Sequence, residues 1–77
     1  MPCFYFDTRD GDSFFRDDIG YDLPDLEAVK KEASLFLADL ARDVLPGSLK
    51  RVLKVEVRDE WRPVMEASLV FEAVLLV

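Results

Sequence analysis

Histidine, asparagine and glutamine are absent from this 77-residue sequence, and cysteine occurs once. Without histidine, the chain lacks the usual general base at neutral pH and the commonest metal ligand. It therefore cannot build a Ser-His-Asp or Cys-His nucleophile, or a Cys/His zinc site, within one chain. A single cysteine also excludes an intrachain disulfide, which disfavours a secreted disulfide scaffold. We expect no catalytic residue, no metal ligand and no cofactor.

Long apolar runs and an excess of basic residues are missing as well. No run approaches the roughly 20 apolar residues that span a bilayer, and the opening MPCFYFD lacks a basic and apolar leader pattern. Acidic residues outnumber basic ones by 16 to 10, for a net charge of −6. Such a charge disfavours nucleic acid and anionic membranes as partners. We therefore expect a cytoplasmic protein with neither partner.

Acidic residues are concentrated in residues 1–25, where seven Asp and two Arg give a net charge of −5. Clustered carboxylates are the ligands that Mg²⁺ or Ca²⁺ prefers. An EF-hand register fails, because Gly11 at loop position 6 would put Phe6 at position 1, where a carboxylate is required. We favour the alternative that these Asp residues form turns, start a helix and keep the chain soluble.

The N-terminal residues predict a β-hairpin. Alternating aromatic residues indicate a strand over 3–8, and Asp10-Gly11 predicts a two-residue type I′ turn into a second strand over 12–16. This register creates an aromatic cross-strand cluster that faces the core. The pairs it predicts are Phe15 with Phe6 and Phe14 with Asp7, and the cluster consists of Phe4, Phe6 and Phe15.

The rest of the chain predicts one helix and two further strands in a single domain, 1–77. Residues 17–24 indicate a loop. An apolar stripe with spacings of three and four, at 26, 29, 33, 36, 37, 40 and 44, predicts an amphipathic helix over 24–45. Alternation then predicts strands over 50–58, with Leu53, Val55 and Val57 facing the helix, and over 63–74. The order ββαββ gives an α+β two-layer sandwich, in which one helix covers a four-stranded antiparallel sheet.

Four segments of the sequence form a recognisable set of motifs: MPCFYFDTRDGD at the start, DLPDLEA at 22–28, LADLARD at 37–43, and VEVRDE with RPV between 55 and 64. Together they resemble a family of short proteobacterial proteins, domain-of-unknown-function family 6894. The resemblance covers nearly the whole chain and implies a small ββαββ protein without an assigned activity. This sequence departs from the family pattern at Cys3, where a basic residue is expected, and at Trp61, where a small residue and Gly are expected.

A looser likeness in layout is to the HicB antitoxins. These proteins also begin with an aromatic strand, an Asp-Gly hairpin, a loop containing Leu-Pro and an amphipathic helix. The likeness covers about the first half of this chain, and a shared layout does not fix a function. What it implies is an acidic surface that binds a small basic partner.

Charged residues of the predicted sheet face opposite the helix have two interpretations each. Asp7, which lies near Arg9 and Arg16 in the predicted hairpin, is either a binding carboxylate or, as we favour, part of a cross-strand ion pair. The basic residues at 50, 54 and 58 are either a phosphate-binding stripe or a solvated face balanced by acidic neighbours, Glu56 and Glu66, and we favour the second interpretation.

Apolar residues on the same face, in the second turn and in the tail are open to partners. Trp61 either packs back on the domain or anchors a partner, because Trp is enriched at interface hot spots. The apolar tail, 74–77, either extends the last strand or pairs with another chain. The candidate interaction residues are Tyr5, Asp7, Phe14, Arg16, Trp61 and Val70.

These observations favour a non-enzymatic interaction or regulatory module that forms a homodimer or binds another protein. A small domain has little core, and a dimer would add buried surface. One alternative is a HicB-like antitoxin that binds a small basic partner. A less favoured alternative is a hydrolase that uses carboxylates and Mg²⁺ without histidine.

Overall fold

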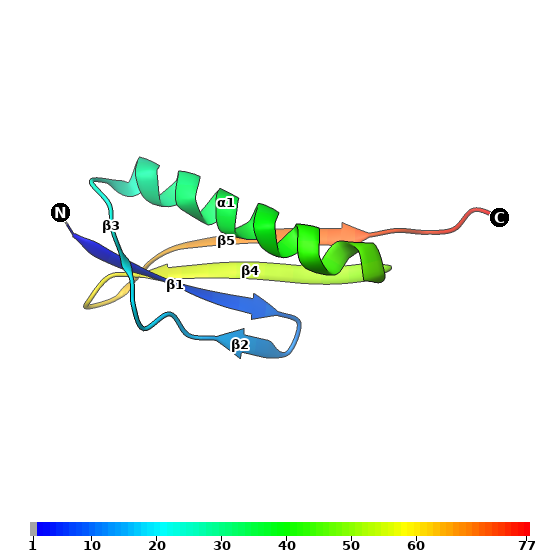
Figure 1. Cartoon of the computed structure of the whole chain (residues 1–77), viewed down its shortest axis with the longest axis horizontal. Coiled ribbons are helices and arrows are strands. Elements are labelled where there is room, and N and C mark those ends of the chain that lie inside the picture. The colour runs from blue at the N-terminus through cyan, green and yellow to red at the C-terminus, as the bar shows by residue number, and fades with distance from the viewer. Residues whose placement is uncertain (1) are drawn as a thin grey trace.

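Five strands form an antiparallel sheet with one helix on one face in the computed structural model, which describes residues 2–77 (Figure 1). The strand order is β2-β1-β4-β5, and β3 pairs with β1. The predicted α+β fold is confirmed, with a short strand, β3, inside the expected loop. Met1, the first residue of the predicted domain, lies outside the described residues. The elements are β1 (Cys3–Asp10), β2 (Ser13–Phe15), β3 (Tyr21–Asp22), α1 (Leu26–Val44), the 3-10 turn η1 (Leu45–Gly47), β4 (Lys50–Arg58) and β5 (Pro63–Glu72).

Helix α1 begins two residues later than predicted, because Asp25 caps it. The Asp25 carboxylate accepts a hydrogen bond of 2.8 Å from the Ala28 N–H, which satisfies one of the free donors of the first turn. Pro24 therefore precedes the cap and does not lie in the first turn. At the other end, α1 passes into η1, where Pro46 has no N–H to continue the helical ladder. Neither helical segment within residues 2–77 has the length and apolar character needed to cross a membrane.

The core lies between α1 and the central strands. Helix α1 packs mainly against β4 and β5, so β2 and part of β1 have no helix above them (Figure 1). The inward residues predicted for β4 are fully buried there, but of the predicted helix stripe only Val29, Ala33 and Leu37 are buried, and Leu26 is 54% exposed. The buried core residues are Phe4, Phe6, Val29, Ala33, Leu37, Leu53, Val55 and Val57.

The first hairpin has a different register from the predicted one. Phe15 pairs with Thr8 and not with Phe6, a shift of two residues. Gly11 has a φ of +58°, and among residues 2–77 only glycines have a positive φ. The turn therefore follows the type II′ pattern, with Gly11 at its first central position. As a result, Phe15 is 64% exposed and does not join the core.

Contacts from β4 explain why Asp10 belongs to β1 and not to the turn. Arg51 donates two hydrogen bonds to the Asp10 carboxylate, of 2.7 and 2.8 Å. The Gly11 N–H donates to the Val52 carbonyl at 3.1 Å. These bonds extend the β1 and β4 ladder to the end of the hairpin, and the turn starts one residue later than predicted.

Strand β5 is two residues shorter than predicted and is followed by an exposed tail. The Ala73 N–H donates to the Leu49 carbonyl at 2.7 Å, the last ladder bond on this side. Residues 74–77 form no regular structure and continue away from the sheet beyond β5 (Figure 1). Their side chains are at least 67% exposed.

Candidate protein-binding groove

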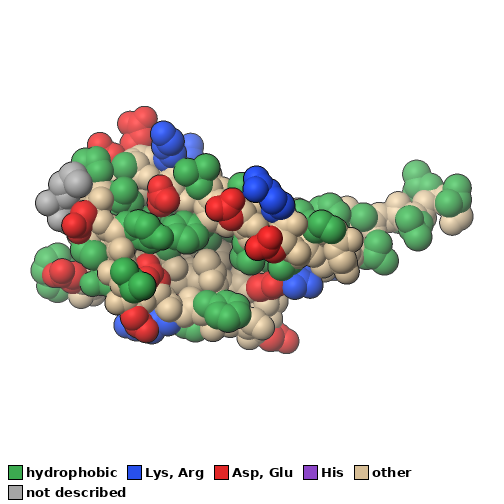
Figure 2. All heavy atoms as spheres, in the orientation of Figure 1, with side chains coloured by type: hydrophobic (Ala, Val, Ile, Leu, Met, Phe, Trp, Pro, Cys, Tyr) green, Lys and Arg blue, Asp and Glu red, His purple; other side chains and the backbone are tan. Residues whose placement is uncertain are grey.

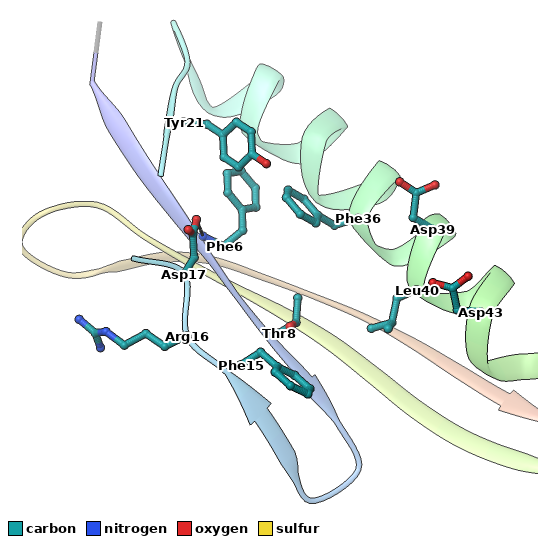
Figure 3. Close-up of a pocket in the computed structure, with 10 residues that line it drawn as sticks. All are labelled: Phe6, Thr8, Phe15, Arg16, Asp17, Tyr21, Phe36, Asp39, Leu40 and Asp43. Atoms are coloured by element: carbon teal, nitrogen blue, oxygen red, sulfur yellow. Dashed lines mark hydrogen bonds between the residues drawn. The ribbon is translucent and has the colours of Figure 1, made fainter. Parts of the chain in front are cut away.

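A groove with a volume of about 440 Å³ lies between α1 and the β1–β2 hairpin (Figure 3). It exists because α1 packs over β4 and β5 and leaves the hairpin side of the same sheet face uncovered. Strand β1 forms its floor, α1 forms one wall, and β2 with the following loop forms the other. The residues that line it are Phe6, Thr8, Phe15, Arg16, Asp17, Tyr21, Phe36, Asp39, Leu40 and Asp43.

Aromatic rings form one end of the groove. Phe6 and Phe36 stack with ring centroids 5.1 Å apart, and Tyr21 meets each of them edge-on at 5.7 Å. Phe15 lies on the opposite wall and has most of its side chain in solvent (Figure 3). The groove thus offers a fixed aromatic end and an exposed aromatic side chain, which are features of protein-binding surfaces.

The helix side of the groove carries two carboxylates. Asp39 and Asp43 lie one turn apart on α1, and both are exposed. Neither has a Lys or Arg nitrogen within ion-pair distance in the described part of the chain, residues 2–77. The one basic residue of the groove, Arg16, already pairs with Asp18 at 3.1 Å. In Figure 2, acidic side chains accordingly lie beside the apolar surface under the helix.

Asp17 fixes the loop that forms the second wall. Its carboxylate accepts hydrogen bonds from three backbone N–H groups, those of Phe6 at 3.0 Å, Ile19 at 3.0 Å and Gly20 at 3.1 Å. The Asp17 N–H in turn donates to the Asp7 carboxylate at 2.9 Å. The loop after β2 is therefore bonded to β1 from both sides, which gives the wall a defined position.

Arg58 connects this loop to β4. Its Nε donates to the Asp7 carboxylate at 3.0 Å, and its Nη2 donates to the Asp17 carbonyl at 2.8 Å. The guanidinium also lies 4.5 Å from the centre of the Tyr5 ring, in cation–π geometry. The hydrogen bond that Arg58 donates to Asp7 raises the pKa of Arg58 above its ordinary value. We call Asp7, Asp17 and Arg58 the loop clamp.

The loop clamp predicts a loss of stability in acid. Burial alone would raise the pKa of Asp17, but the N–H donors of Phe6, Ile19 and Gly20, together with Arg58, lower it below its ordinary value. The unfolded chain, with a carboxyl pKa of about 3.9, therefore takes up this proton more readily than the folded chain. The stabilisation is complete above that value and is lost as the pH falls through the lower folded-state pKa.

Urea denaturation at a series of pH values below about 5 measures this loss. Asp59, whose pKa is lowered by the N–H groups of Trp61 and Arg62, contributes with the same sign. An Asp17→Asn variant is expected to show a shallower fall in unfolding free energy with decreasing pH. An unchanged slope would contradict the role given to the Asp17 carboxylate.

The structure brings only three of the six sequence-predicted interaction residues together. Tyr5, Asp7 and Arg16 lie around the loop clamp, and of the six only Arg16 lines the groove. Phe14 lies under the Arg9 guanidinium at 4.4 Å. The other two are far apart in the fold. Trp61 is 83% exposed in the β4–β5 turn, and Val70 is 67% exposed on β5.

Ion pairs on the sheet face opposite the helix fit the interpretation that its basic residues are balanced by acidic neighbours. The basic side chains at 50, 54 and 58 each face an acid, so this stripe is balanced. Asp7 does belong to an ion pair, but its partner is Arg58 and not Arg9 or Arg16. The pairs are Lys50 with Glu72, Lys54 with Glu66, and Arg58 with Asp7.

The N-terminal Asp residues make separate contacts in the fold and do not form one cluster. Asp10 binds Arg51, Asp18 binds Arg16, and Asp25 caps α1. Within residues 2–77, no three acidic or thiol side chains lie close enough together to hold a metal ion. The interpretation of these residues as turn, cap and solubility elements fits their contacts.

Most of the groove residues were not singled out from the sequence. Phe36 and Leu40 were assigned to the core stripe of the helix, but they are only partly buried, at its edge. A signal was present in the sequence: Asp39 and Asp43 each lie three residues after one of these apolar positions. An acidic row next to an apolar row indicates an exposed boundary and not a buried stripe.

A family model described as a domain of unknown function (DUF6894) matches residues 3–70. The chain belongs to this family. The match confirms the resemblance stated above, and it covers the groove and the loop clamp but not the apolar tail. No curated protein and no solved structure matched the chain. Membership of DUF6894 brings no assigned activity, so a function for the groove has to be argued from its residues.

Proposed function

We propose that this DUF6894 domain is a non-enzymatic protein-binding module, and that the groove between α1 and the β1–β2 hairpin holds a basic, partly apolar segment of its partner. One observation carries the proposal. An exposed aromatic groove has two carboxylates on its rim, Asp39 and Asp43, and within residues 2–77 neither has a Lys or Arg nitrogen at ion-pair distance. Apolar side chains of the partner would fill the groove, and Lys or Arg would pair with the rim.

The energetics favour such a segment. Covering a large apolar side chain such as Phe15 contributes about 1.5–3 kcal/mol, and aromatic contacts with the rings at the groove end add to it. The rim carboxylates contribute less affinity, but they select a basic partner and speed its association. The net charge of −6 also attracts a basic partner, and it does so at longer range than the rim carboxylates.

The chemistry of the partner is limited by the groove itself. The apolar tail of a second copy has no Lys or Arg in residues 73–77, so it would leave the rim carboxylates unpaired. A small basic protein, which is the partner class implied by the likeness to HicB antitoxins, has the required chemistry. The groove's ionisable groups also favour binding over catalysis, because the Asp17 carboxylate is occupied by three N–H donors.

A random peptide library displayed on phage tests the proposal. We expect selected peptides to combine Lys or Arg with Trp, Phe or Leu. The Asp39→Lys/Asp43→Lys variant should weaken binding of a selected peptide at least about tenfold, because rim attraction becomes repulsion. Phe15→Ser should weaken it by a similar factor, because it removes exposed aromatic surface.

The matched control is Glu27→Lys/Glu60→Lys, which changes the net charge equally at exposed positions outside the groove. This control should keep an affinity within about threefold of the wild type at moderate salt. Equal loss of binding in the control and in the rim variant would contradict a specific groove site. Selection of acidic or uncharged peptides would contradict the proposed partner chemistry.

A further inference from the structure

The outer edge of β5 carries unpaired backbone groups. Strand β5 is the last in the order β2-β1-β4-β5, and within the described residues, 2–77, it pairs only with β4. The bond from the Ala73 N–H to the Leu49 carbonyl shows that the odd-numbered residues of β5 direct their backbone groups toward β4. Beyond the register shift at the start of β5, the even-numbered residues therefore direct theirs to the outer edge. These residues are Glu66, Ser68, Val70 and Glu72.

This edge has little protection against pairing with another strand. Strand β5 is 10 residues long, and neither Lys nor Arg lies within it. Its one proline, Pro63, is at the first position, and the register shift opposite Val57 and Arg58 is at the same end. A long edge strand without basic residues or an internal proline is a template for strand pairing.

We propose that a second copy of the chain occupies this edge, with β5 and its symmetry mate pairing antiparallel. The two sheets then form one continuous sheet with both helices on the same face. The groove lies near β2, at the opposite edge, so the dimer leaves both grooves open. The inference is therefore independent of the proposed function.

Backbone parity and charge limit the register of the pair. Two-fold symmetry between edges that both expose even-numbered residues places Ser68 or a neighbouring position on the axis. An axis at Leu69 would set Glu66 against Glu72 of the second copy, and like charges opposite each other are destabilising. An axis at Ser68 or at Val70 avoids this contact, and each makes the backbone bonds of three residue pairs. We assign the axis to Ser68, because that register also places Leu75 opposite Trp61 of the second copy.

This register also accounts for two exposed apolar features at opposite ends of β5. Counting outward from Ser68, position 75 of one copy is opposite position 61 of the other. Leu75 is 76% exposed in the tail, and Trp61 is 83% exposed in the β4–β5 turn. The tail continues beyond β5 (Figure 1), and in the dimer it runs beside the turn of the second copy. Both side chains thereby lose water-exposed surface.

Sedimentation equilibrium of the wild-type chain tests the dimer directly. We expect twice the 8.8 kDa chain mass at concentrations of about 100 µM. Ser68→Pro removes an N–H that points to the outer edge and keeps every bond to β4. It should raise the dimer dissociation constant at least about tenfold without changing the circular dichroism spectrum. If Ser68→Pro prevents folding, Val70→Glu should give the same monomer, because in this register it sets the new carboxylate of one copy against Glu66 of the other.

A cysteine placed on the axis tests the register. Residues paired at a two-fold axis have Cα atoms about 5.5 Å apart, within the range that a disulfide bridges. Ser68→Cys should therefore form a covalent dimer under mild oxidation. The controls are the wild type, which has only Cys3, and Ser34→Cys on the exposed face of α1. A monomeric wild type, a dimer that persists in Ser68→Pro, or equal crosslinking of Ser34→Cys would overturn the proposal.

Discussion

Replacing Arg58 with methionine should lower the free energy of unfolding by about 2–3 kcal/mol. The variant leaves Asp7, which is 6% exposed, without a cation, and it leaves the Asp17 carbonyl without its donor. Loss of one partner from a fully buried pair costs about 3–5 kcal/mol. The expected loss is smaller here because the Arg58 side chain remains 23% exposed and water partly screens the pair. Urea denaturation measures the difference.

Arg9→Met is the matched control for this variant. Arg9 also lies on the sheet face opposite the helix and forms a 2.8 Å ion pair with Glu56, but the two side chains are 46% and 32% exposed. Exposed pairs contribute about 0–1 kcal/mol, so the control should lose less than about 1 kcal/mol. Equal losses in the two variants would mean that the loop clamp contributes no more than a surface ion pair.

Replacing Gly20 with alanine should destabilise the domain by about 2–4 kcal/mol. Gly20 has a φ of +82°, where a side chain introduces strain, and its N–H donates to Asp17. An added Cβ would lie 2.6 Å from the Cys3 Sγ and 2.9 Å from a Tyr5 ring carbon. The variant must therefore move the loop, β1 or both. Loss of β3 pairing should accompany the loss of stability, and hydrogen exchange at the β3 amides measures it.

Alanine substitutions at the other two glycines are controls for the stability loss expected from Gly20→Ala. Gly11 has a φ of +58° but has no atom near an added Cβ, so Gly11→Ala should cost about 1–2 kcal/mol from strain alone. Gly47 has neither a positive φ nor a near neighbour, and Gly47→Ala should change stability by less than about 1 kcal/mol. A Gly20→Ala variant as stable as Gly11→Ala would contradict the close packing of the loop on β1.

Local patterns in the sequence predicted the regular elements well. The strand over 50–58 has the predicted bounds, and its inward residues Leu53, Val55 and Val57 are fully buried. The apolar period of the helix identified Val29, Ala33 and Leu37 as core. These predictions succeeded because the spacing of apolar residues along a single helix or strand determines which side chains share the buried face. The helix start was misplaced by only two residues, since a proline and an Asp cap are adjacent in the sequence.

The groove depended on contacts between distant elements and could not be predicted in this way. Asp10-Gly11 and Gly11-Asp12 are both acceptable two-residue turns, and the choice between them was made by Arg51 and Val52, about 40 residues later in the chain. That choice shifted Phe15 away from Phe6 and out of the core. The position of α1 over β4 and β5 then left Phe15 uncovered.

The loop clamp was missed for a similar reason. A cross-strand ion pair was predicted for Asp7, but only Arg9 and Arg16 could be placed near it, because the sequence did not give the strand order. In the fold, β4 lies beside β1, and Arg58 reaches Asp7 across a separation of 51 residues. The two-residue strand β3 is too short to leave an alternating pattern, and it depends on the bonds that Asp17 makes to the loop.

Mapping a selected peptide onto the domain by amide chemical shifts tests the central claim most directly. The claim is that the groove between α1 and the β1–β2 hairpin binds a basic, partly apolar segment. We predict saturable shift changes at Phe15, Tyr21 and Leu40, with no such changes at Val52 or Val70 on the other face of the sheet. Saturable changes confined to Val52 and Val70, or no saturable change with any selected peptide, would contradict the account.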